Sequence, residues 1–180
     1  FPPEELPKNV GDAFAKLYRY GGAHFIFGIP GIAFAEGRCV GGSTVINGGM
    51  CWRTPERILE RWRIEEGIEK IEPEFLERYF EAVEKRIHVQ EQPPHTWSRA
   101  GILFKEAAES LGWKVMTDRR NQKGCRGLSM CMAGCPAGAK QSVLHTYIQD
   151  FLKRDGTLFA GFRAEKLIFD GRKVNGVLCR

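Results

Sequence analysis

The sequence of 180 residues contains no run that approaches the roughly 18 consecutive apolar residues needed to span a membrane, so we expect no transmembrane segment in this chain. It also lacks a block of like charges, because the net charge of +5 is spread along the chain. That distribution argues against a nucleic-acid-binding arm or a basic membrane-binding patch, and we expect no nucleic-acid partner. A hydrophobic content of 43% is typical of a folded domain with one sizeable core.

The chain begins with Phe1 rather than Met, and no basic stretch followed by an apolar segment opens it. We therefore expect an internal piece of a longer polypeptide. The sequence leads to no prediction of the compartment in which the protein lies. A G-x-G-x-x-G turn, the usual sign of a dinucleotide-binding strand and helix, is also missing. The four histidines form no His-x3-His ligand pair, and we predict no catalytic residue within this chain.

Periodicity and end signals predict both helices and strands. Helices are expected from Thr54 to Gly67 with Thr54 as N-cap, and from Pro73 to Ile87, where apolar residues recur as an amphipathic stripe. Two more are expected from Ser98 to Leu111, with Ser98 as N-cap, and from Ser142 to Gly156. A short strand is expected over residues 113–116. Residues 157–179 are expected to hold strands over 157–160, 164–169 and 173–179, the last two joined as a hairpin by a turn at Asp170-Gly171. Prolines and glycines interrupt every period before Arg53, so loop and short strand are expected there and no long helix. One α/β or α+β unit with partly segregated helices and strands follows.

Five glycines lie among small and polar residues in the segment 36–53. Side chains are missing where a backbone would need to approach another group closely. Successive backbone N–H groups in such a loop suit phosphate oxygens, and Ser43, Thr44 and Asn47 add hydrogen-bonding groups. A flat ring could lie against Gly48-Gly49. A tight turn packed in a core would explain the glycines as well, and composition does not separate the two.

The run Gly41-Gly42-Ser43-Thr44-Val45-Ile46-Asn47-Gly48-Gly49-Met50, flanked by Arg38 and Arg53, resembles the flavin-covering signature of the glucose-methanol-choline (GMC) oxidoreductases. The resemblance implies an FAD-dependent enzyme in which residues 36–53 pack over the isoalloxazine ring and the pyrophosphate. Carried over by position, the cofactor-binding residues are Arg38, Gly41, Gly42, Ser43, Thr44, Asn47, Gly48, Gly49, Met50 and, at the adenine, Ala164.

The same resemblance implies that residues 1–180 are one fragment of a Rossmann-like FAD-binding region. The fragment lacks the dinucleotide-binding strand, turn and helix of that family, and it lacks the domain that carries the catalytic base. We therefore expect the fragment alone to bind FAD poorly and to be inactive.

Three of the six cysteines, Cys125, Cys131 and Cys135, lie in a glycine-rich loop over residues 121–140 with C-x5-C-x3-C spacing. Thiolates this close in sequence can converge on one soft metal centre, and a final Cys-Pro pair is typical of ferredoxin cluster loops. Zinc fits less well, because structural zinc sites use four ligands and this loop offers three. A buried, metal-free cysteine loop stays open as an alternative.

This cysteine loop resembles that of the GMC dehydrogenases of sugars and polyols, in which three cysteines at this spacing hold a 3Fe-4S cluster. By that resemblance Cys125, Cys131 and Cys135 are the metal ligands. The pairs Cys135-Pro136 and the run Gly138-Ala139-Lys140-Gln141-Ser142 are also similar to a branch that acts on long-chain alcohols and sterols.

The resemblance predicts oxidation of the CH–OH group of a small alcohol or sugar, with hydride transfer to flavin N5. With a cluster, electrons would pass to a redox partner such as a cytochrome, and without one dioxygen would be the acceptor. The alternative function is a small iron-sulfur or zinc module that transfers electrons or stabilises a complex without catalysis. That alternative leaves the glycine loop unexplained.

Overall fold

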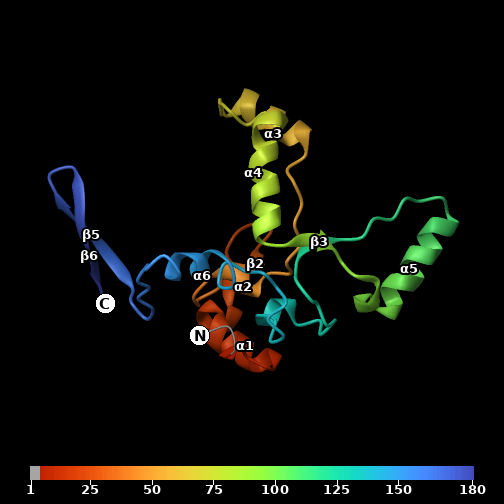
Figure 1. Ribbon diagram of the computed structural model, residues 1–180, viewed down its shortest axis with the longest axis horizontal. Helices are drawn as coiled ribbons and strands as arrows, with labels where there is room; N and C mark the ends of the chain where they lie inside the picture. Colours follow the sequence, from red (N-terminus) through yellow and green to blue (C-terminus); the bar gives the residue numbers. More distant parts are fainter. Residues whose placement is uncertain (1–4) are drawn as a thin grey trace. The chain divides into compact units, whose positions relative to one another are not determined.

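The computed structural model describes residues 5–180, which divide into two compact units, one reaching Gln149 and the other spanning Asp150–Arg180. In the described residues, helices alternate with two-stranded antiparallel sheets (Figure 1). This mixture agrees with the α/β class expected from the sequence. Across the same residues, every helix is too short or too polar to cross a membrane.

The first helix, α1 (Val10–Leu17), lies in the segment for which no long helix was expected. Asn9 caps it, because its side chain accepts a hydrogen bond from the backbone N–H of Asp12 at 2.8 Å. Ala13 and Leu17 are fully buried, so one face of this eight-residue helix packs into the interior. At eight residues α1 is consistent with that expectation, but the short helix itself was not predicted. It forms because a capped, amphipathic turn fits between Pro7 and the glycine pair that follows.

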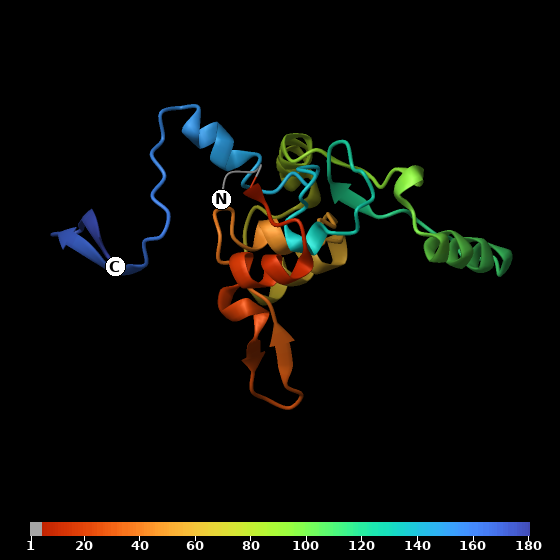
Figure 2. The same cartoon turned by 90° about the horizontal axis from the view of Figure 1, so that it is seen from below.

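After α1, the 3-10 turn η2 (Arg19–Gly22) leads to a hairpin of β1 (His24–Ile26) and β2 (Ile32–Phe34). Figure 2 shows this hairpin extending away from α1. Its tip is apolar and solvent-exposed, since Phe27 and Ile29 keep almost their whole surface accessible. The short strands agree with the prediction of loop and short strand for this region.

Three longer helices follow: α3 (Glu56–Glu65), α4 (Pro73–Arg86) and α5 (Arg99–Ser110). All three were predicted, and Ser98 caps α5 by accepting from the Gly101 N–H at 3.0 Å, as expected. The predicted cap of α3 is wrong. Pro55 holds the N-cap position and no side chain caps this helix, so Thr54 lies one residue too early to serve.

The strands β3 (Val89–Glu91) and β4 (Arg119–Asn121) pair antiparallel, with Gln90 opposite Arg120. The other edge of β4 contacts the glycine loop, where Met50 bridges to Arg120 and the Asn121 N–H donates to the Gly49 carbonyl at 3.0 Å. The strand predicted over residues 113–116 is absent from the described structure. Residues 119–121 form the strand instead, because β4 pairs with other segments on both of its edges. The apolar pattern of the sequence cannot reveal such partners.

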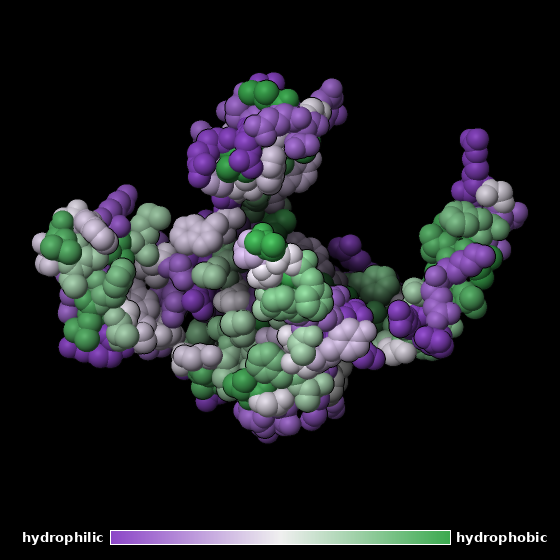
Figure 3. All heavy atoms as spheres, turned by 180° about the vertical axis from the view of Figure 1, so that it is seen from behind, coloured by the Kyte–Doolittle hydropathy of each residue, from purple (hydrophilic) through white to green (hydrophobic). Residues whose placement is uncertain are grey.

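The buried core lies where α1, α2 (Ser43–Ile46) and the 3-10 turn η4 (Cys131–Ala133) meet (Figure 1). Its members are Leu6, Ala13, Leu17, Tyr18, Val45, Ile46, Ala133 and Leu144. The core therefore joins the glycine loop to the cysteine loop. It is smaller than composition suggested, because much apolar surface stays exposed on other elements such as α5 and the β1–β2 hairpin (Figure 3).

Helix α6 (Tyr147–Leu152) crosses from the first unit into the second and is shorter at both ends than predicted. Residues 143–146 form a turn instead, and the buried Thr146 hydroxyl donates to the Ser142 carbonyl at 2.9 Å. In the second unit, β5 (Ala164–Asp170) and β6 (Lys173–Cys179) form the predicted hairpin. The strand expected over residues 157–160 is absent from the described structure.

Candidate functional site

The glycine loop folds around a short helix rather than as an open coil. Gly41 has φ +90°, and a Cβ there would lie 2.8 Å from the Val45 side chain and 3.0 Å from the Leu144 backbone nitrogen. Gly41 is therefore required for close packing of α2. Gly42 also has a positive φ, of 55°, but a Cβ there would meet no atom within 4 Å. The Cβ direction of Gly41 is therefore blocked by neighbouring atoms, whereas that of Gly42 is open.

One face of the loop is accessible. Ser43, Asn47 and Met50 are exposed, whereas Val45, Ile46 and Gly49 are buried. A Cβ on Gly48 would meet only the Met50 side chain, at 3.8 Å. An isoalloxazine ring needs backbone that no side chain covers, and the open Cβ directions of Gly42 and Gly48 meet that need.

The polar side chains predicted to contact the cofactor bond to the chain itself. Ser43 Oγ accepts from the Gly37 N–H at 3.0 Å, and Asn47 Oδ1 accepts from the Gly49 N–H at 3.0 Å. Thr44 Oγ1 donates to the Gly41 carbonyl at 2.6 Å. These bonds set the shape of the loop, and direct contact with a cofactor stays a prediction. The side chain of Arg38, also predicted to contact the cofactor, is exposed.

A cavity of about 790 Å³ borders the open face, and both Gly48 and Met50 line it. Its wall is mainly apolar, with large side chains from Phe14, Trp97, Phe104, Met116, Met130 and Met132. Two buried donors on the same wall, Arg120 Nε and Gln122 Nε2, have no hydrogen-bond partner in the described part of the chain. The cavity thus combines an apolar surface with unused donors that an oxygen atom could satisfy.

The three predicted metal ligands do meet at one place. Cys125, Cys131 and Cys135 all line a cavity of about 20 Å³ that also borders the glycine loop. Each sulfur accepts an N–H hydrogen bond, from Gly127, Arg120 and Lys140 respectively, at 3.5, 3.9 and 3.4 Å.

This small cavity does not fit an iron-sulfur cluster. A space of about 20 Å³ holds roughly one water molecule. Over residues 5–180, no group of three or more His, Cys, Asp or Glu side chains is placed to hold a metal ion. The structure therefore gives no support to the 3Fe-4S cluster, nor to the alternative function as an iron-sulfur or zinc module.

Lys140 connects the two loops, and sequence reasoning assigned it no role. Only 3% of its surface is exposed, and its Nζ donates to the carbonyls of Val45, Asn47 and Cys131 at 2.6, 2.7 and 2.6 Å. Burial lowers the pKa of this amine to about 8, although the nearby Cys131 and Cys135 thiols oppose that shift. The Gly138-Ala139-Lys140 motif was the one signal in the sequence that could have pointed to it.

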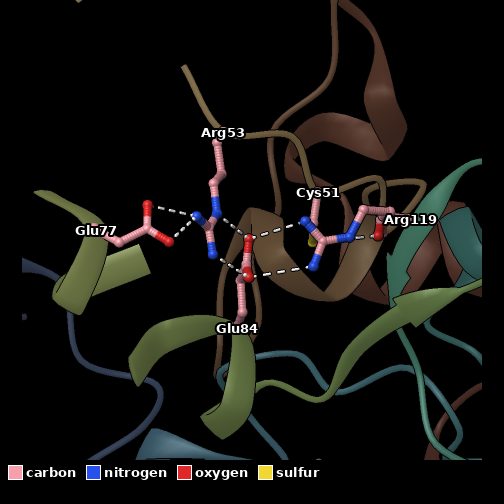
Figure 4. Close-up of polar contacts among 6 residues, drawn as sticks. Cys51, Arg53, Glu77, Glu84 and Arg119 are labelled. Carbon is pink, nitrogen blue, oxygen red and sulfur yellow. Dashed lines mark hydrogen bonds and ion pairs between the residues drawn. The ribbon is translucent and has the colours of Figure 1, made fainter. Parts of the chain in front are cut away.

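A second connection runs from the end of the glycine loop to α4 (Figure 4). Arg53 makes a two-point contact with the Glu84 carboxylate, at 2.8 and 2.9 Å, and also bonds Glu77 at 2.6 Å. Arg119 of β4 contacts both oxygens of Glu84 at 3.2 Å. Hydrogen bonds from Arg53, and to a smaller extent from Arg119, lower the pKa of Glu84 to about 2. The cluster anchors the end of the glycine loop to both α4 and β4.

Ala164, the residue predicted at the adenine, is the first residue of β5 and pairs with Cys179. It lies in the second unit, whereas the other predicted cofactor-binding residues lie in the first. Its predicted contact with the adenine is therefore untested and stays a prediction.

Comparison with known proteins confirms the family that the glycine loop resembles. Residues 14–180 match the family model described as GMC oxidoreductase. A GMC-type oxidoreductase of Sinorhizobium fredii is 37% identical over 166 residues, which are 92% of this chain and 33% of that protein. A GMC-type oxidoreductase of Mycobacterium tuberculosis strain H37Rv is 34% identical over 169 residues, 94% of this chain and 27% of that protein.

A long-chain-alcohol oxidase of Arabidopsis thaliana is 30% identical over 142 residues, 79% of this chain and 19% of that protein. No solved structure matches. The chain thus spans at most about a third of the length of these relatives. Because the family model covers nearly the whole chain, including both the glycine loop and the cysteine loop, this chain belongs to the GMC oxidoreductases.

Proposed function

We propose that the intact protein is an FAD-dependent oxidoreductase that oxidises the CH–OH group of an alcohol, and that the open face of the glycine loop borders its flavin. Family membership over residues 14–180, together with the uncovered backbone at Gly42 and Gly48, carries the proposal. Bound FAD would supply the hydride-accepting ring. This chain would supply the surface against which that ring and its diphosphate lie.

The residues of the loop divide into two sets under this proposal. Gly42, Gly48 and Met50 lie on the accessible side and would contact the cofactor. Gly41 and Gly49 pack inward and would keep the loop in place, since a Cβ on Gly49 would lie 2.7 Å from Asn121 Oδ1. The family's proton-accepting base is not assigned to any residue of this chain.

Replacement of Gly48 by valine tests the placement of the flavin. Gly48 has no positive φ and its Cβ direction is open, so Gly48→Val should fold normally while its side chain occupies the proposed ring surface. Gly176→Val in β6 is the matched control, because that glycine also lacks a positive φ and its Cβ would make ordinary contact with Ile168 at 3.7 Å.

We expect purified Gly48→Val to lose most of its FAD, measured by visible absorption and by release of the flavin on denaturation, while Gly176→Val keeps it. Equal thermal unfolding temperatures would show that both variants fold. Full FAD occupancy in Gly48→Val would contradict the placement. A wild-type protein without any flavin absorption would contradict the proposed function itself.

For the substrate, we propose an apolar alcohol rather than a sugar. The wall of the 790 Å³ cavity beside Met50 is mainly apolar, which favours burial of a hydrocarbon chain over that of a polyhydroxylated sugar. A relative named as a long-chain-alcohol oxidase is consistent with this choice. Anaerobic bleaching of the flavin by a long-chain primary alcohol, with no bleaching by glucose, is the expected result, and the reverse order would contradict it.

The same preparation tests the electron acceptor. A cytochrome partner was expected only if the cysteines held a cluster, and the small cavity between them lends that no support. We therefore propose dioxygen as the acceptor. Oxygen consumption with the alcohol, and no reduction of added cytochrome c, is the expected outcome.

A further inference from the structure

The carbonyl groups at the end of α2 need partners. The last turn and the C-cap of this helix are formed by Val45, Ile46 and Asn47. No N–H group of the helix itself donates a hydrogen bond to the carbonyls of such end residues. Val45 and Ile46 are buried, so water cannot serve their backbone groups freely. An unpaired buried carbonyl is unfavourable, and the cysteine loop lies directly against this turn.

Two buried side chains meet this need. The Lys140 ammonium group has three N–H bonds, and each is directed at one carbonyl: Val45, Asn47 and, in the cysteine loop, Cys131. The Tyr18 hydroxyl lies 2.6 Å from the Met132 carbonyl and 3.4 Å from that of Ile46. The Lys140 ammonium and the Tyr18 hydroxyl thus lie within hydrogen-bonding distance of three successive carbonyls of the glycine loop and of two carbonyls of the cysteine loop.

The charge on Lys140 faces three carbonyl groups and the nearby Cys131 and Cys135 thiols. No carboxylate lies within ion-pair distance of its Nζ among residues 5–180, so the carbonyl dipoles stabilise the cation. A positive charge beside the carbonyl end of a helix is favourable. A neutral side chain of the same length would leave three carbonyls unpaired while filling the same space.

We propose that Lys140 is a positioning residue for the flavin: its ammonium group clamps the cysteine loop onto the glycine loop and thereby holds Gly48 and Met50 on the open face. The cysteine loop then serves as a support for the flavin-contacting backbone, and it needs no metal for that purpose. The inference rests on the proposed function for its flavin readout, but the clamp itself can be measured without FAD.

The first experiment measures hydrogen exchange in the intact protein stripped of FAD. Lys140→Met fills the site with an unbranched apolar chain, and Tyr18→Phe removes one hydroxyl as a milder variant. We expect amide exchange over residues 43–50 and 131–135 to accelerate about tenfold or more in Lys140→Met, since each lost buried bond is worth about a factor of ten. A smaller change at the same segments is expected for Tyr18→Phe.

The control is Leu59→Ala in α3, which removes buried apolar volume without touching either loop. It should lower the unfolding temperature and leave exchange over residues 43–50 unchanged. If Lys140→Met and Tyr18→Phe both show wild-type exchange in these segments, the clamp is overturned. A uniform acceleration over the whole chain in Lys140→Met, with no preference for these two segments, would overturn it equally.

The second experiment measures FAD. We expect the dissociation constant of FAD to rise about tenfold or more in Lys140→Met. Its remaining bound flavin should show altered visible circular dichroism, because the ring would lie against a displaced backbone. Leu59→Ala should keep the wild-type flavin spectrum even where it lowers stability. Wild-type affinity and an unchanged spectrum in Lys140→Met overturn the positioning role, whereas a wild-type protein that binds no FAD overturns the proposed function and leaves the exchange result to decide on the clamp.

Discussion

Neutralising Glu84 gives a direct test of how the glycine loop is anchored. The carboxylate accepts four hydrogen bonds from Arg53 and Arg119, and Glu84→Gln keeps its size while removing its charge. The pKa of Glu84 falls from an ordinary 4.5 to about 2 in the folded protein. That difference corresponds to at most about 3 kcal/mol of stability. Because the side chains of Arg53 and Arg119 are 32% and 36% exposed, solvent screening reduces the expected value to about 1–2 kcal/mol.

The pH dependence has a defined sign. A carboxyl group whose folded pKa is depressed contributes stability that is fully present above its unfolded pKa and is lost as the pH falls through the folded pKa. We therefore expect the free energy of unfolding of the wild type to fall between about pH 4.5 and 2 by the amount that Glu84→Gln has already lost at pH 7. Below that window the two proteins should converge.

Denaturant unfolding at pH 7 and at pH 3 measures this difference. Glu60→Gln is the matched control, because Glu60 pairs with Arg63 one turn away on α3, where their side chains are 54% and 47% exposed, and we expect no measurable change there. If Glu84→Gln is as stable as Glu60→Gln at pH 7, the anchoring argument is refuted. A difference between the two proteins that is the same at pH 3 as at pH 7 would refute the electrostatic cause while leaving a packing effect.

Three further outcomes follow from the same geometry. Gly49→Ala should destabilise the protein by about 1–3 kcal/mol, because Gly49 has φ +76° and its Cβ would lie 2.7 Å from Asn121 Oδ1. Gly42→Ala has only the unfavourable positive φ, so its loss of stability in denaturant unfolding should be smaller. Asn9→Ala removes the cap of α1 and should lower stability by about 1 kcal/mol, with faster amide exchange confined to that helix. Elemental analysis should find no stoichiometric iron or zinc, and iron that disappears in Cys131→Ser would restore the cluster interpretation.

Local patterns were sufficient for several elements. The stripe of apolar residues after Pro73 and the Ser98 cap predicted α4 and α5, and the turn at Gly171 predicted the β5–β6 hairpin. Each of these depends on residues close together in the chain, so its energetics are readable from a short window. The run from Gly41 to Met50 likewise indicated the family, because the residues that carry the resemblance to the flavin-covering signature follow one another in the chain.

Tertiary structure decided what lies between those elements. β4 forms because Met50 and β3 occupy its two edges, and no local pattern around Arg119 and Arg120 reveals those partners. The cysteines share one small cavity, although their spacing alone also allowed a metal cluster. Spacing along the chain states which side chains can converge, but only packing sets how much room remains between them.

Lys140 illustrates the difference most clearly. By itself the sequence determined that a glycine loop and a cysteine loop exist, and that a lysine follows the second. The structure decided that this lysine is buried and bonded to carbonyls 95 and 93 residues earlier in the chain. A lysine is ordinarily a solvated surface residue, and its burial is stable here because folding brings carbonyl groups from both loops around one ammonium ion.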